Sequence, residues 1–236
     1  MRKKERQALR RAFAAPPAQR KAAFLQQLPA PTLTSRQFVL GQTAYIRKGT
    51  WLASVGLFAV AWCVAVWLKQ DVVWLISALF PFVAVTAVIE GARADMHGMT
   101  ELEMAARFSH KSVLLARMTI VGALHVVLLC LLSPLCWLHG SATMLHTGAY
   151  LLAPYLLTTV LGLHTTRKLH GKEAGYVCLV EAALVSVGNL LFRVVFSTLF
   201  LPLYADRWLL LCVLLAGLTA YEYRKQIDQT EELVWN

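Results

Sequence analysis

The chain has 236 residues, of which 58% are hydrophobic and 15% are charged, and its formal net charge is +10. A soluble domain carries roughly 25% charged residues, so this composition excludes an ordinary water-soluble globular protein. The positive charge does not call for nucleic acid as a partner, because basic segments beside a membrane are attracted to anionic lipids at its cytoplasmic face.

Residues 1–49 form a basic segment ahead of the first long apolar run. Four prolines interrupt residues 1–34. Ser35 then offers an N-cap for a helix that continues to Lys48. Apolar residues recur in it at helical spacing with basic residues around them, so we expect an amphipathic helix that lies flat at the cytoplasmic membrane surface.

Six apolar stretches follow, and they are nearly free of charge. A helix needs about 20 residues to cross the hydrocarbon core of a bilayer, and continuous apolar runs are typical of helices rather than of barrel strands. We therefore predict an all-α integral membrane protein with a six-helix transmembrane domain at 50–223 and a cytoplasmic tail at 224–236. The predicted spans are about 50–68, 72–89, 113–135, 145–163, 176–192 and 208–223.

The distribution of Lys and Arg predicts the orientation, because cytoplasmic loops are enriched in these residues. All but three of the 23 fall in the N-terminal segment, in the connections after the second and fourth spans, or after the sixth. The exceptions are Lys69, Arg193 and Arg207. We therefore expect a multi-pass protein of the cell membrane with both termini and Gly171 in the cytoplasm and Gly140 outside.

The connection between the second and third spans carries its own helix signal. Thr100 and Glu103 match a capping box, in which each side chain accepts a hydrogen bond from the other residue's backbone amide. A short helix is predicted over Glu101–Phe108, with acidic residues near its positive end. A loop that only joins two spans does not need a separately capped helix. The alternative interpretation is padding at the membrane surface.

The fifth apolar stretch contains polar residues. Asn189 and Arg193 lie one helical turn apart, and Glu181 falls within about a third of the circumference from them. Because charge in lipid is costly, this polar stripe is expected to face protein or a water-filled path. The alternative is that Glu181 and Arg193 lie near opposite membrane surfaces and extend toward water.

The sequence contains no motif for catalysis or cofactor binding. It lacks a nucleotide-binding G-x-x-x-x-G-K-[ST] loop, an H-E-x-x-H zinc motif and a G-x-S-x-G elbow. His125 has no carboxylate or cysteine at ligand spacing, so a hydrogen bond to a neighbouring helix is its expected role. The cysteines form no metal-binding spacing. We therefore expect no enzyme activity and no catalytic, cofactor or metal site in this chain.

Six spans, a flat helix before the first and a capped helix after the second resemble the type-2 permease family of ATP-binding-cassette (ABC) exporters. The segment ELEMAARFSHKSVLLARM is similar to the acidic-hydrophobic and then basic phrase that this family often carries there. The resemblance implies a coupling helix that docks on a separate ABC ATPase subunit, which binds the ATP, and a second permease half in a homo- or heterodimer. It also implies a re-entrant segment at 193–207. The residues implied for docking are Thr100, Glu101, Leu102, Glu103, Met104 and Phe108.

The resemblance favours the membrane-spanning permease subunit of an ABC exporter, and two other functions stay open. The basic N-terminal segment is longer than the family needs, so the chain could instead be a membrane-anchored regulatory or assembly protein that tethers a cytoplasmic partner through residues 1–48. An integral membrane enzyme would need converging catalytic groups that the sequence does not contain. No residue pattern identifies a transported substrate.

Overall fold

A computed structural model of the chain describes residues 34–67, 73–97, 110–138, 144–169, 171–200 and 202–235. The chain divides into two compact units, Met1–Ser35 and Arg36–Asn236, and the second contains nearly all of the described residues. Every regular element in the described residues is a helix, which confirms the predicted all-α class for this part of the chain.

The helices and turns of the described residues are as follows, in chain order. They are α3 (Ser35–Thr43), α4 (Lys48–Trp67), α5 (Val73–Ser77), α6 (Phe80–Gly91), α7 (Arg93–Met96), α9 (His110–Leu138), α10 (Met144–Lys168), α11 (Lys172–Val195), the short 3₁₀ turns η1 (Ser197–Phe200) and η2 (Pro202–Tyr204), and α12 (Ala205–Trp235).

Five candidate membrane spans occur in the described residues: α4, the α5–α6 pair, α9, α10 and α11 are each long and apolar enough to cross a bilayer. They indicate a multi-pass membrane protein. The sixth predicted span falls in α12, which does not reach the same criterion. Its apolar part, between Arg207 and Glu222, is shorter than the roughly 20 residues that a span needs.

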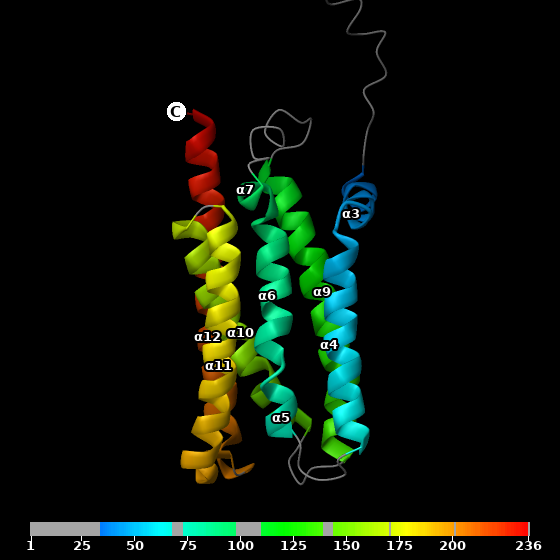
Figure 1. Cartoon of the computed structure of the whole chain (residues 1–236), viewed down its shortest axis with the longest axis vertical. Helices are drawn as coiled ribbons and strands as arrows, with labels where there is room; N and C mark the ends of the chain where they lie inside the picture. The colour runs from blue at the N-terminus through cyan, green and yellow to red at the C-terminus, as the bar shows by residue number, and fades with distance from the viewer. Residues whose placement is uncertain are drawn as a thin grey trace, which may run out of the picture. The chain divides into compact units, whose positions relative to one another are not determined.

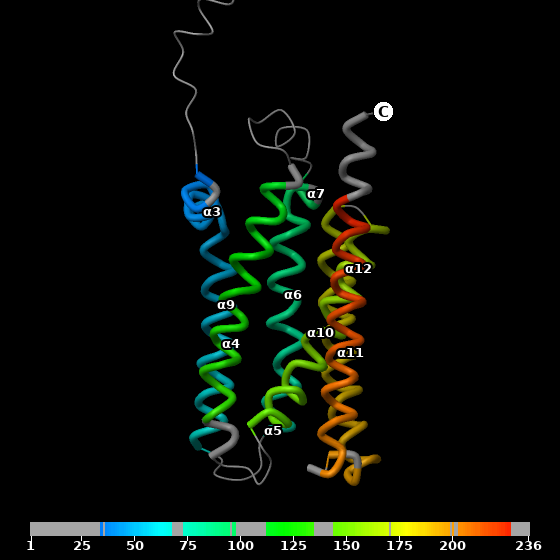
Figure 2. The backbone as a smooth tube through the Cα atoms, turned by 180° about the vertical axis from the view of Figure 1, so that it is seen from behind, coloured from blue at the N-terminus to red at the C-terminus, as the bar shows by residue number. Residues whose placement is uncertain are grey.

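Within the second unit, α6 stands between two groups of helices (Figure 1). On one side it packs against α4 and α9, and on the other against α10 and α11. The α10 helix packs against α6, α9, α11 and α12, which makes it the centre of the second group. The view from behind shows the same order (Figure 2). The α3 and α7 helices lie at one end of these helices, while α5 and the 3₁₀ turns lie at the other (Figure 1).

Small residues let these helices approach closely, as is usual inside membranes. A Cβ atom added to Gly162 of α10 would come within 3.1 Å of the Val88 side chain on α6. Ala182 and Cys178 of α11 are fully buried against Val85 and Val88. The α6–α10–α11 contact therefore depends on small side chains on two of its three helices.

Several boundaries differ from the predicted ones for local reasons. The second span is broken by a turn at 78–79, and Pro81 lies at the start of α6. Proline lacks the amide hydrogen that would continue the helix and is favoured in a first turn. The amphipathic helix ends at Thr43 instead of continuing to Lys48, which begins α4. In the predicted re-entrant segment 193–207, α11 extends to Val195 and the two 3₁₀ turns lead directly into α12.

Candidate functional site

A buried carboxylate, Glu90, ties the start of α4 to the end of α6. Its side chain is 2% exposed. The Thr50 hydroxyl donates to Glu90 Oε2 at 2.8 Å, and the Arg47 amide donates to Oε1 at 3.5 Å. Arg93 Nη1 lies 3.0 Å from Oε1 and also donates to the Tyr45 carbonyl at 3.2 Å. We call Tyr45, Arg47, Thr50, Glu90 and Arg93 the Glu90 joint.

The local sequence explains why the joint forms. The first turn of α4 leaves backbone amides without helical acceptors, and a carboxylate near that positive helix end is stabilised. Arg93 follows Glu90 by three residues, so both side chains lie on one face of the chain as it passes from α6 into α7. Ile46, in the turn that precedes α4, is buried against Ala87 and Val121 and holds this turn in place.

The chain around the joint also contacts α9 and α11. Met96 of α7 is buried with Ala92 of the α6–α7 connection and Ala174 of α11. At Gly91, an added Cβ atom would come within 3.0 Å of the Met118 sulfur on α9. The α6–α7 segment is therefore in contact with α4, α9 and α11 at one end of the described helices.

A second set of polar contacts joins α10 to its neighbours. Arg167 Nη2 lies 3.2 Å from Glu222 Oε2 on α12, and His164 Nδ1 lies 3.4 Å from Glu222 Oε1. One residue after His164, the Thr165 hydroxyl donates to Glu181 of α11. The α10 helix thus reaches an acidic residue on two of its neighbours, Glu181 of α11 and Glu222 of α12.

A third network surrounds His125, near the middle of α9. Its Nε2 atom is 2.9 Å from the Ser54 hydroxyl of α4 and 3.4 Å from the Thr86 hydroxyl of α6. Its Nδ1 atom is 3.1 Å from the Tyr155 hydroxyl of α10. The expectation that this histidine bonds to a neighbouring helix is confirmed, and the network includes four helices rather than two.

The polar stripe of α11 does not gather into one site. Glu181 bonds to Thr165 on α10, and the Asn189 amide donates to the Ser77 hydroxyl at the end of α5. The Arg193 guanidinium carbon lies 4.8 Å from the centre of the Phe200 ring. Glu181 and Asn189 therefore face protein at different levels of α11, while Arg193 lies beside the aromatic turn that follows this helix.

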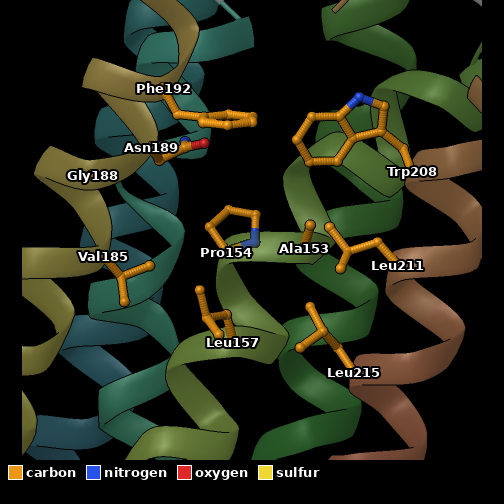
Figure 3. Close-up of a pocket in the computed structure, with 10 residues that line it drawn as sticks. All are labelled: Ala153, Pro154, Leu157, Val185, Gly188, Asn189, Phe192, Trp208, Leu211 and Leu215. Carbon is orange, nitrogen blue, oxygen red and sulfur yellow. The ribbon is translucent and has the colours of Figure 1, made fainter. Parts of the chain in front are cut away.

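A groove of about 340 Å³ lies between α11 and α12, with α10 as its floor (Figure 3). Figure 3 shows Phe192 and Trp208 facing each other from the two walls, with Pro154 between and below them. The groove is almost entirely apolar, and Asn189 is the polar side chain at its edge. Its ten lining residues are Ala153, Pro154, Leu157, Val185, Gly188, Asn189, Phe192, Trp208, Leu211 and Leu215.

The residues predicted to dock an ATPase, Thr100, Glu101, Leu102, Glu103, Met104 and Phe108, lie outside the described residues. The segment that contains them, 98–109, is bracketed by the described α7 and α9. Glu90 is not among the residues that the sequence predicted for a site. The signal was one acidic residue at the end of the second apolar stretch, followed three residues later by Arg93.

Within the described ranges, no three His, Cys, Asp or Glu side chains lie close enough together to hold a metal ion. Comparisons with protein-family models, with curated proteins and with solved structures found no match to this chain.

Proposed function

We propose that the chain is the membrane-spanning permease subunit of an ABC exporter, driven by a separate ATPase that docks on residues 100–108. One observation carries the proposal: the Glu90 joint links the start of the first span to the chain that leads into the proposed docking segment. A transporter driven from a cytoplasmic loop needs a stiff path from that loop to its spans.

The contacts of the Glu90 joint could form such a path between the docking segment and the spans. A push on 98–109 would act on α7 at one side and on α9, which starts at His110, at the other. From α7, Met96 would carry the displacement to α11, and Glu90 with Arg93 would carry it to α4. Packed helices with polar links respond by shifting as rigid elements, which is the motion needed to alternate between two access states.

The proposal includes a topology of six spans with both termini in the cytoplasm. The α3–α7 end would then face the cytoplasm, in agreement with the high proportion of Lys and Arg in the segments at that end. The sixth span would be the apolar part of α12. A second permease half, from another copy or a similar chain, would complete the pore.

Co-purification from the native cells tests this function. The tagged full-length protein is extracted in mild detergent, and its partners are identified by mass spectrometry. We expect a P-loop ATPase that co-purifies with the wild type and is lost with Leu102→Asp combined with Phe108→Asp, because charge would enter an apolar docking contact. Leu169→Asp, in the connection between α10 and α11, is the control that should retain it.

Two outcomes would count against the proposal in different ways. If the wild type recruits no ATPase, the permease function is wrong, and tethering of a cytoplasmic partner through residues 1–48 becomes the better hypothesis. If the ATPase binds the wild type and the double variant equally, the permease function stands and the docking element lies elsewhere.

A further inference from the structure

We propose that the groove between α11 and α12 binds one acyl chain of a phospholipid, whose phosphate lies beside Arg193 and Arg207. The proposal does not depend on transport or on an ATPase. It requires only that α10, α11 and α12 lie in a bilayer. Its basis is an apolar groove whose end at Phe192 and Trp208 lies next to a cluster of aromatic and cationic side chains.

The helix packing explains why the groove exists. Both α11 and α12 pack closely on α10 but make few contacts with each other. Gly188 leaves the α11 wall open, since an added Cβ atom there would meet no other atom within 4 Å. Pro154 and Ala153 provide a floor with little side-chain volume. The space between the walls therefore stays open to whatever surrounds the helices.

The length of the groove fits one membrane leaflet. Its walls run from Val185 to Phe192 on α11 and from Trp208 to Leu215 on α12. Seven residues of helix rise about 10 Å, which is most of the roughly 15 Å depth of one half of the hydrocarbon core. A chain that enters between Phe192 and Trp208 would end near the middle of the bilayer.

The aromatic end of the groove has the character of a membrane interface. Phe200 is buried, with its ring centre 5.2 Å from that of Trp208 and 5.9 Å from that of Phe192. Arg193 covers the Phe200 ring at 4.8 Å, and Arg207 covers the Tyr204 ring at 4.7 Å. Aromatic side chains gather at the headgroup level of membranes, and a guanidinium group binds phosphate through paired hydrogen bonds.

The local charge favours an anionic headgroup. Between positions 193 and 207 the sequence carries Arg193, Asp206 and Arg207, for a net charge of +1. Asp206 lies next to Arg207 and weakens its attraction for phosphate. Arg193, which follows the groove residue Phe192 in α11, is therefore the stronger candidate for the headgroup contact.

The volume of the groove favours a lipid chain over a helix of a second copy. A helix with its side chains is about 10–12 Å across, so two turns of it would occupy roughly 1,000 Å³. The groove encloses about 340 Å³, and even all of the open space up to and including its mouth amounts to only about 770 Å³. A thin, flexible hydrocarbon chain can lie inside this space, whereas a helix could only cover its opening.

Photolabelling of the full-length protein tests the proposal. The protein is placed in phosphatidylcholine nanodiscs that contain a trace of phosphatidylglycerol with a photoreactive diazirine in one acyl chain. Labelled peptides are quantified by mass spectrometry. We expect labelling at Leu157, Val185 and Leu211 to exceed that at Leu52 of α4, whose exposed side chain reports the bulk lipid.

Gly188→Leu fills the groove and should lower its labelling roughly fivefold, which corresponds to about 1 kcal/mol of binding free energy. Gly217→Leu is the matched control, because an added Cβ atom at Gly217 of α12 also meets nothing within 4 Å and this residue does not line the groove. Leu211→Trp narrows the groove from the opposite wall and provides a second test if Gly188→Leu fails to fold. Arg193→Gln should reduce phosphatidylglycerol labelling to the level of a phosphatidylcholine probe with the same chains.

Three results would overturn the proposal. Groove labelling equal to that at Leu52, or unchanged in both folded groove variants, would mean that only bulk lipid is present. Unchanged phosphatidylglycerol labelling in Arg193→Gln would remove the headgroup contact. A cross-linked dimer formed by p-benzoylphenylalanine at position 211, in place of a lipid adduct, would assign the groove to a second copy of the chain.

Discussion

The two ends of the described helices are held together by different kinds of contact. At the α3–α7 end, charged and hydroxyl side chains link the helices, through Glu90 with Arg93 and Thr50 and through Glu222 with Arg167. At the opposite end, the rings of Tyr150, Phe192, Phe200 and Trp208 form a cluster of tilted and edge-on contacts. We call them the polar end and the aromatic end.

This difference matters because lipid gives helices no hydrophobic reason to associate. Hydrogen bonds and ion pairs fix the distance and direction between two helices, so the polar end suits the transmission of a displacement. Aromatic contacts tolerate a wider range of geometries and are compatible with lipid. The groove lies next to the aromatic end, between α11 and α12, which make few direct contacts with each other.

The largest effect is expected from Glu90→Leu, which removes the hydrogen bonds and the ion pair of Glu90 at the polar end. The substitution leaves Arg93 and the start of α4 without their shared acceptor. Breaking a fully buried ion pair costs about 3–5 kcal/mol, and because Arg93 is 30% exposed, we expect a loss of about 2–4 kcal/mol in the free energy of unfolding. Unfolding in mixed detergent micelles measures it.

Asp206→Leu is the control for Glu90→Leu, because Asp206 is an exposed acidic residue at the aromatic end. Its free energy of unfolding should stay within about 0.5 kcal/mol of the wild type. Equal losses in the two variants would mean that the ends do not differ in the way proposed.

A smaller effect is expected from Phe200→Ala, which removes the contacts of the Phe200 ring with Phe192 and Trp208 at the aromatic end. Phe→Ala in a soluble core costs about 3–5 kcal/mol. Lipid solvates the ring in the unfolded state as well as protein does, so we expect the lost packing to cost about 1–3 kcal/mol. Leu203→Ala, at a side chain that is 82% exposed, should be close to neutral in the same unfolding measurement. No difference between the two variants would show that the ring cluster does not hold this end.

The smallest effect is expected from His125→Leu, between the two ends. Interhelical hydrogen bonds in membranes contribute about 0.6 kcal/mol on average and up to about 1.7 kcal/mol. Since His125 bonds to three other helices, we expect a loss of about 0.5–2 kcal/mol in unfolding free energy. Val126→Ala, at the exposed neighbouring side chain, is the control. A loss as large as that of Glu90→Leu would move the main polar link to the middle of the helices.

The sequence predicted the helical class and the approximate positions of five spans, because long apolar stretches are local signals. It predicted that the polar stripe of Glu181, Asn189 and Arg193 faces protein or a water-filled path, with extension toward opposite membrane surfaces as the alternative. The sequence did not indicate that Glu181 bonds to Thr165 and Asn189 to Ser77, which come from other parts of the chain. Helix packing decides such pairs, and no local pattern encodes them.

The two features on which the proposals depend were harder to predict for the same reason. Glu90 looked like the end of an apolar stretch, and only the fold places Thr50 and Arg47 beside it. The groove arises because α11 and α12 share α10 without closing on each other. The sixth predicted span, 208–223, falls in a single helix, α12, that continues to Trp235 beyond its short apolar part.

The proposed function requires that the polar end faces the cytoplasm, and cysteine labelling in intact cells tests this directly. Leu203→Cys at the aromatic end and Lys172→Cys at the polar end are introduced separately after the five native cysteines are replaced by alanine. Both positions are exposed, and Lys172 avoids the strain that a side chain would meet at Gly171, where φ is +80°. A membrane-impermeant maleimide should label position 203 in intact cells and position 172 only after the cells are opened. Labelling of position 172 in intact cells would contradict the proposed topology, and with it an ATPase acting on the α7–α9 connection.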